Sequence, residues 1–245
     1  MRKNRLYLLL PIRSLMFIAV FIIISLMSGE KLENLFHWWS VIASIINILV
    51  IGILLFLCKK QKITYGKLIQ YEKGKCKWYV AFLMVVSMLI AGMGGMYLAG
   101  FICYGVFPYL APMLIAPIPL ILALLNLVLL PISTTLAEDG LYLGLGVNNI
   151  KNKWIAIFVP AFFYAIQHSF IPLLLDGRYI MYRFLSFLPL TLWICYWYYK
   201  NRNPLPIMIG HGILNVATAV NILVTSAVPS VYEMMKIKGR LEGRM

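Results

Sequence analysis

Apolar segments about as long as a bilayer crossing recur along most of this chain. They lie near residues 6–28, 38–57, 78–104, 119–145, 154–175, 184–199 and 207–228. A helix needs about 20 consecutive apolar residues to cross about 30 Å of hydrocarbon. Because backbone polar groups in lipid must be paired within the protein, such segments fold as helices. The pattern predicts an all-α, polytopic helical membrane protein with seven or eight transmembrane helices.

The few charges of the chain are mostly basic and are unevenly distributed. Charged residues make up 12% of the sequence, against about 25% in soluble domains. The net charge of +14 would suggest nucleic acid in a soluble protein, but seven of the lysines lie in one loop, 58–77. Basic residues mark cytoplasmic loops. We therefore expect a single integral membrane domain, 1–245, that is multi-pass in the cell membrane, with the bilayer and not nucleic acid as its partner and with the N-terminus and the basic loop 58–77 in the cytoplasm.

The proline-rich stretch from Phe107 to Pro119 leaves the number of crossings open. It contains four prolines, so it cannot be a regular helix throughout. Seven crossings would place the basic C-terminal tail, including Lys236 and Arg244, on the side opposite the basic loop, against the positive-inside rule. An eighth or broken crossing, most simply in this stretch, would remove that conflict, and we favour it.

Two adjacent acids and two histidines fall inside the apolar segments of the second half of the chain. An ionisable side chain at membrane depth costs about 3 kcal/mol or more, so it marks a polar pocket or a functional site. Each histidine has a second polar residue four positions away, on the same helix face. The set comprises Glu138, Asp139, Tyr164, His168, His211 and Asn215. We expect these side chains to converge on one pocket.

These residue types suit the hydrolysis of an amide. A carboxylate beside an imidazole can polarise a water molecule, and a second histidine with an asparagine can donate hydrogen bonds to a developing oxyanion. Alternatively, Glu138, His168 and His211 could bind zinc and leave one coordination position open for water. The residues alone leave both mechanisms open.

Three short motifs resemble those of the CAAX protease and bacteriocin-processing (CPBP, or Abi) family. The first motif of that family has two glutamates, three variable residues and an arginine; residues 138–144 read EDGLYLG. The second has an aromatic residue four positions before a histidine; residues 163–168 read FYAIQH. The third has a histidine four positions before Asn or Asp; residues 210–215 read GHGILN. The resemblance covers a catalytic core at about 120–228.

The resemblance implies an intramembrane endopeptidase that cleaves a membrane-associated peptide or a CAAX-type substrate. By analogy, Glu138 and His168 would activate the attacking water, and His211 and Asn215 would stabilise the oxyanion, supported by Asp139 and Tyr164. Members of the family have been called metalloproteases, so zinc is an alternative cofactor. The glutamate-based mechanism, which we favour, requires none.

Two positions depart from the first motif. Asp139 stands where the family has its second glutamate, and Leu143 stands where it has the arginine. These changes favour an alternative function, a catalytically weak membrane scaffold or bacteriocin-immunity protein that binds a peptide or protein partner. A transporter is a third interpretation, because prolines and paired acids also suit ion coupling. The sequence has no internal duplication to support it.

Overall fold

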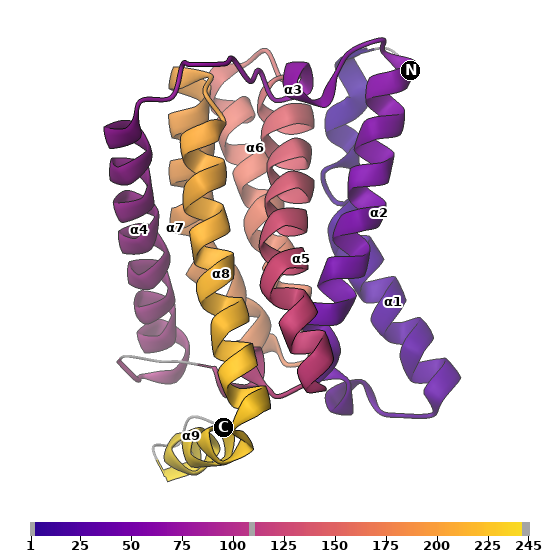
Figure 1. Cartoon of the computed structure of the whole chain (residues 1–245), viewed down its shortest axis with the longest axis vertical. Coiled ribbons are helices and arrows are strands. Elements are labelled where there is room, and N and C mark those ends of the chain that lie inside the picture. The colour runs from indigo at the N-terminus through magenta and orange to yellow at the C-terminus, as the bar shows by residue number, and fades with distance from the viewer. Residues whose placement is uncertain (1–2, 108–110, 242–245) are drawn as a thin grey trace.

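The computed structural model describes residues 3–107 and 111–241, and the side-chain surroundings of 6–107 and 111–236. The chain is 82% helical, and the described part contains no strand. The long helices stand side by side along the long axis of the molecule (Figure 1). They are α1 (Ile12–Ser28), α2 (Trp39–Lys60), α4 (Trp78–Tyr104), α5 (Leu120–Glu138), α6 (Lys153–Ile166), α7 (Gly177–Asn201) and α8 (Leu205–Ala227). The predicted class, a polytopic helical membrane protein, is confirmed.

Six helical segments of the described chain are long and apolar enough to cross a membrane. They are Leu6–Ser28, Phe36–Lys60, Trp78–Tyr104, Leu120–Val147, Gly177–Asn201 and Leu205–Ala227. The remaining predicted span, 154–175, corresponds to α6, which has 14 residues and continues as the 3₁₀-helix η6 (Gln167–Phe170). This helix is shorter than its neighbours because the chain leaves the α-helical path before the bundle ends.

The proline-rich stretch does not supply an eighth crossing in its described part. Helix α4 ends and α5 begins at the same end of the bundle, and the stretch joins them there (Figure 1). Its residues 111–119 contain only the four-residue 3₁₀-helix η4 (Pro112–Ile115); Pro108 lies outside the described residues. Side chains of neighbouring helices bind its backbone: Trp39 Nε1 donates to the Leu114 carbonyl at 3.1 Å, and the Ile118 amide donates to Ser226 Oγ at 3.1 Å.

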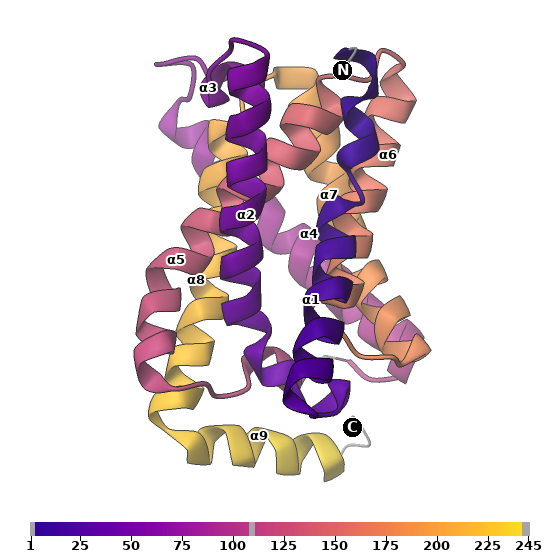
Figure 2. The ribbon, with the colours of Figure 1, turned by 90° about the vertical axis from the view of Figure 1, so that its right-hand side faces the viewer.

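Helix α9 (Pro229–Leu241) lies across this same end of the bundle, perpendicular to the long helices (Figure 2). The opposite end holds the N-terminal η1 (Lys3–Leu9), the loop with α3 (Tyr65–Leu68) and the connections α5–α6 and α7–α8 (Figures 1 and 2). The basic loop and the N-terminus therefore share one end, as expected. The basic C-terminal helix α9 lies at the opposite end of the bundle from the basic loop. The positions of these two basic segments therefore still disagree with the positive-inside rule.

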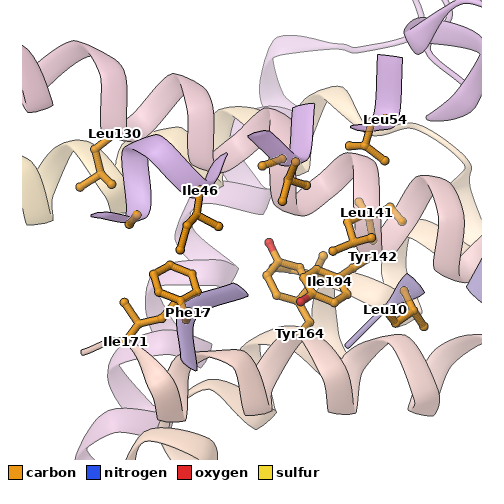
Figure 3. Close-up of a cluster of buried hydrophobic side chains, with 14 of the residues drawn as sticks. Leu10, Phe17, Ile46, Leu54, Leu130, Leu141, Tyr142, Tyr164, Ile171 and Ile194 are labelled. Atoms are coloured by element: carbon orange, nitrogen blue, oxygen red, sulfur yellow. The ribbon is translucent and has the colours of Figure 1, made fainter. Parts of the chain in front are cut away.

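The buried centre of the bundle brings the first two helices against the second half of the chain. Phe17 of α1 and Ile46 of α2 are fully buried, as are two tyrosines, Tyr142 and Tyr164, at the level of the acidic pair. The two tyrosine rings are stacked with their centroids 4.5 Å apart, and Figure 3 shows them in the middle of this apolar cluster. The cluster fixes the helices that carry the polar side chains.

Candidate active site

The acidic pair lies where helix α5 changes into a π-helix. Glu138 is the last residue of α5, and Asp139 is the first of η5 (Asp139–Val147). π-Helices are rare in proteins, and those that occur are often found at functional sites. The two side chains are 1% and 0% exposed. Two carboxyl groups are therefore held side by side in the interior.

Glycines of the first motif let the short helix α3 close over the π-helix. A Cβ added at Gly140 would lie 2.7 Å from Leu54 Cδ1 and 2.8 Å from Tyr65 Oη, closer than real contacts allow. Tyr65 Oη donates to the Leu136 carbonyl at 2.6 Å. Burial raises the pKa of the Tyr65 hydroxyl, which stays protonated and keeps this donor role. These glycines are explained by packing, and they bring a cap onto the helix segment that carries the acids.

Glu138 binds an arginine on one side and faces a histidine on the other. Its Oε1 forms a hydrogen-bonded ion pair with Nη1 of Arg13, a residue of α1 that is 1% exposed. Its Oε2 lies 3.4 Å from Nε2 of His211. Arg13 also donates to Gln167 Oε1 and, from Nε, to Asn47 Oδ1 at 3.1 Å. The carboxylate is thus anchored by one oxygen, while the other points toward the imidazole.

Asp139 holds the other nitrogen of the same imidazole. Its Oδ1 lies 3.3 Å from His211 Nδ1 and accepts a hydrogen bond of 3.1 Å from Tyr164 Oη. Tyr164 Oη is also 3.1 Å from His211 Nδ1. The Nδ1 edge of His211 is therefore oriented by a carboxylate and a phenol. In many hydrolases a third group orients the catalytic base in the same way.

His168 and Asn215 lie one helical turn beyond Tyr164 and His211 on helices that run in the same direction (Figure 1). The His168 ring stacks on Phe187 with centroids 3.5 Å apart, and it forms no ion pair with either acid. Asn215 Nδ2 donates to the His211 carbonyl at 3.1 Å. The structure thus brings the side chains of four of the six predicted residues into contact with one another, while the Asn215 side chain contacts the backbone of His211 and the His168 ring lies against Phe187.

Three buried atoms of the site have no hydrogen-bond partner within the described protein. They are Glu138 Oε2, Asp139 Oδ2 and Gln167 Nε2. Buried polar atoms are almost always paired, so such a group of two acceptors and one donor calls for an explanation. A water molecule or a polar group of a substrate would satisfy them.

The predicted zinc ligands do not form a metal site in this arrangement. Within residues 3–107 and 111–241, no three His, Cys, Asp or Glu side chains have the spacing to hold a metal ion. His168 is turned toward Phe187, and Arg13 binds one oxygen of Glu138. The residues therefore do not fit the zinc set Glu138, His168 and His211, and no chemical step is assigned to zinc.

An apolar groove of about 400 Å³ lies beside the site, between α5 and α8. Thr135, one turn before Glu138, and Gly212, directly after His211, contribute to its lining. The other lining residues include Ile132, Leu136, Ile209 and Ile213. An apolar chain in this groove would lie next to the helix segments that carry the acid and the histidine.

Three residues of the site were not predicted from the sequence: Arg13, Asn47 and Gln167. All three are buried, and they come from α1, α2 and η6. Arg13 carried a usable signal, because it is a charge inside an apolar segment, the feature that marked the acids. Asn47 and Gln167 are uncharged and gave none.

Fold and site together define a polytopic helical membrane protein with a buried carboxylate and imidazole centre. Residues 117–217 match the family model described as "Rce1-like: Type II CAAX prenyl endopeptidase Rce1-like". The match confirms the resemblance predicted from the three motifs and supports a CAAX-type intramembrane protease in general. All six predicted site residues lie in the matched segment, whereas Arg13 and Asn47 lie outside it. No curated protein and no solved structure matches the chain.

Proposed function

We propose that this chain is an intramembrane endopeptidase that hydrolyses a peptide bond of a membrane-associated peptide or CAAX-type substrate. The observation that carries the proposal is the position of Glu138 Oε2. This buried oxygen has no hydrogen-bond partner among the residues that the structure describes, and it lies 3.4 Å from His211 Nε2. A water molecule between a carboxylate and an imidazole is the nucleophile that amide hydrolysis needs.

In the proposed reaction Glu138 takes a proton from the water molecule while the oxygen of that water attacks the scissile carbonyl. The proton then passes to the leaving amine as the carbon–nitrogen bond breaks. His211 shares the water with Glu138 because it is the imidazole nearest to that carboxylate, and Asp139 and Tyr164 hold its other nitrogen. This assignment gives His211 the place that the family resemblance gives to His168.

His168 and Asn215 are then assigned to the oxyanion. His168 follows Tyr164 by one helical turn, and Asn215 follows His211 by one helical turn, on helical segments that run in the same direction. An imidazole N–H and an amide N–H are suitable donors to a tetrahedral intermediate. In this conformation the Asn215 amide donates a hydrogen bond to the His211 carbonyl. To donate to a substrate, Asn215 must break this hydrogen bond and form a new one with the oxyanion.

The groove between α5 and α8 supports a substrate with an apolar part. Its lining is almost entirely apolar, and it borders Thr135 and Gly212. A substrate that is itself in the membrane can reach this face without leaving the hydrocarbon. The basic loop 58–77 supports an orientation with the N-terminus in the cytoplasm.

A membrane scaffold or immunity protein is the second candidate, and one observation favours it. Glu138 and Asp139 are 1% and 0% exposed, and Arg13 already neutralises one of the acids. A closed, charge-paired centre of this kind can also serve to hold helices together. The two candidates differ in whether the acids are needed for peptide cleavage.

The test uses the full chain in reconstituted vesicles with two probes, a quenched fluorescent farnesylated CAAX peptide and the same peptide without the prenyl group. We expect Glu138→Ala and His168→Ala to abolish cleavage. The matched controls are Glu72→Ala, whose side chain is 65% exposed, and His37→Ala, a histidine in a connection away from the site. If Glu138→Ala and His168→Ala cleave like the parent, the protease proposal fails.

A further inference from the structure

Arg13 is a full charge buried in the first long helix, far in sequence from the catalytic motifs. It lies two residues into α1, a 17-residue helix without another charged side chain, and it is 1% exposed. A buried charge is retained only where it is paired and hydrogen-bonded. The side chains that pair with Arg13 therefore indicate its role.

Arg13 binds three side chains from three different elements. Nη1 donates to Glu138 Oε1 at the end of α5 and to Gln167 Oε1 in η6, and Nε donates to Asn47 Oδ1 of α2 at 3.1 Å. Gln167 Oε1 also accepts a hydrogen bond of 2.9 Å from Tyr142 Oη. Because Gln167 directly precedes His168, Arg13 links the first catalytic motif to the second.

The first motif itself has no cation at the position where its family carries one. That position is Leu143, which is 0% exposed and packs in the apolar core. The nearest positive charge to Glu138 comes instead from α1, 125 positions away in sequence. The helix that supplies it lies outside the matched segment 117–217.

We propose that Arg13 is a positioning residue of the active site, which replaces from α1 the cation that the first motif lacks at Leu143. The inference rests on the proposed function. Arg13 holds Oε1 of Glu138 and so turns Oε2 toward His211. Arg13 does not touch the water or the substrate.

A stability cycle tests the pairing without any measurement of cleavage. Arg13→Leu leaves Glu138 as an uncompensated buried charge and should lower the melting temperature of the purified protein in detergent. Adding Glu138→Gln removes that charge and should restore most of the loss. Adding Asp139→Asn, the matched control at the neighbouring acid, should not. Where Arg13→Leu does not fold, the same comparison is read from the yield of folded protein.

Cleavage of the farnesylated peptide tests the positioning role. We expect Arg13→Leu to lower kcat by about 100-fold, the order expected for a misplacement of about 1 Å, with KM changed less than about twofold. Arg13→Lys, which keeps the charge, should recover part of the loss.

The two measurements separate failure of this inference from failure of the proposed function. No rescue of Arg13→Leu by Glu138→Gln, or equal rescue by Asp139→Asn, overturns the pairing. A normal kcat in Arg13→Leu overturns the positioning role. Absence of cleavage by the parent contradicts the proposed protease, while the stability cycle still decides whether Arg13 is the partner of Glu138.

Discussion

Helices α2 and α5 carry two buried polar clusters of different character. In the first cluster Asn126 Nδ2 donates to Ser40 Oγ at 3.1 Å, and Ser44 Oγ donates to Asn126 Oδ1 at 3.0 Å. All three side chains are buried, and the described structure leaves no polar atom of theirs unpartnered. In the second cluster, around Glu138 and Asp139, one oxygen of each acid has no hydrogen-bond partner within the described part of the chain.

The difference separates two uses of polar residues in a membrane protein. Hydrogen-bonded side chains between helices join the helices, and each such contact contributes about 0.5–2 kcal/mol. A cluster with buried atoms left unpaired is costly, so it persists where chemistry or binding requires it. The Asn126 cluster is therefore a structural joint, and the acidic cluster is the candidate site.

Restoring the second glutamate of the family motif should have a large effect on the acidic cluster. Asp139→Glu adds a methylene to a side chain that is 0% exposed and already 3.1–3.3 Å from Tyr164 and His211. The longer carboxylate would displace the imidazole by about 1 Å and lower kcat about 100-fold. Asp139→Asn, which keeps the length, is the control. Unchanged or increased kcat in Asp139→Glu would show that the acid does not orient His211.

Removing the phenol that bridges Asp139 and His211 should have a smaller effect. Tyr164→Phe deletes the hydroxyl that lies 3.1 Å from both partners but keeps the ring stacked on Tyr142. The loss of one hydrogen bond of about 1–1.5 kcal/mol predicts an approximately tenfold fall in kcat. The matched control is Tyr142→Phe. If both variants lower kcat equally, the contact between Tyr164 and His211 is not what matters.

Breaking the joint cluster should affect stability alone. Asn126→Leu removes the amide that binds Ser40 and Ser44. We expect the free energy of unfolding to fall by about 1–2 kcal/mol, measured by denaturation in mixed micelles, while kcat stays within about twofold of the parent. A large loss of cleavage in a folded Asn126→Leu protein would mean that the two clusters do not differ in function.

The sequence predicted the helical class and most of the site because both depend on local spacing. Segment length and hydropathy determine the helices, and i to i+4 spacing places polar residues on one face. The same spacing predicted that Tyr164 and His168 share a face. Although the chain changes to a 3₁₀-helix at Gln167, the Tyr164 and His168 rings still stack with their centroids 6.4 Å apart. The closer contact of the His168 ring with Phe187 comes from α7, and local spacing does not reveal it.

The remaining features depend on contacts between distant helices. Arg13 and Glu138 meet only because α1 packs beside the second half of the chain, and no local pattern in α1 encodes that contact. The proline-rich stretch was expected to help form an eighth crossing because of the charge of the C-terminal tail. In the structure its backbone is hydrogen-bonded by side chains of α2 and α8 at the end of the bundle, an arrangement that charge counting does not detect.

The most direct test of the central claim compares Glu138→Gln with Asn126→Leu in the same vesicles, using the farnesylated peptide in ¹⁸O-labelled water. The parent and Asn126→Leu should release a product with ¹⁸O in its new carboxylate, and Glu138→Gln should be slower by about 100-fold or more, the scale of general base catalysis. Labelled product formed by Glu138→Gln at the parental rate would contradict the assignment of the acidic cluster as the hydrolytic centre.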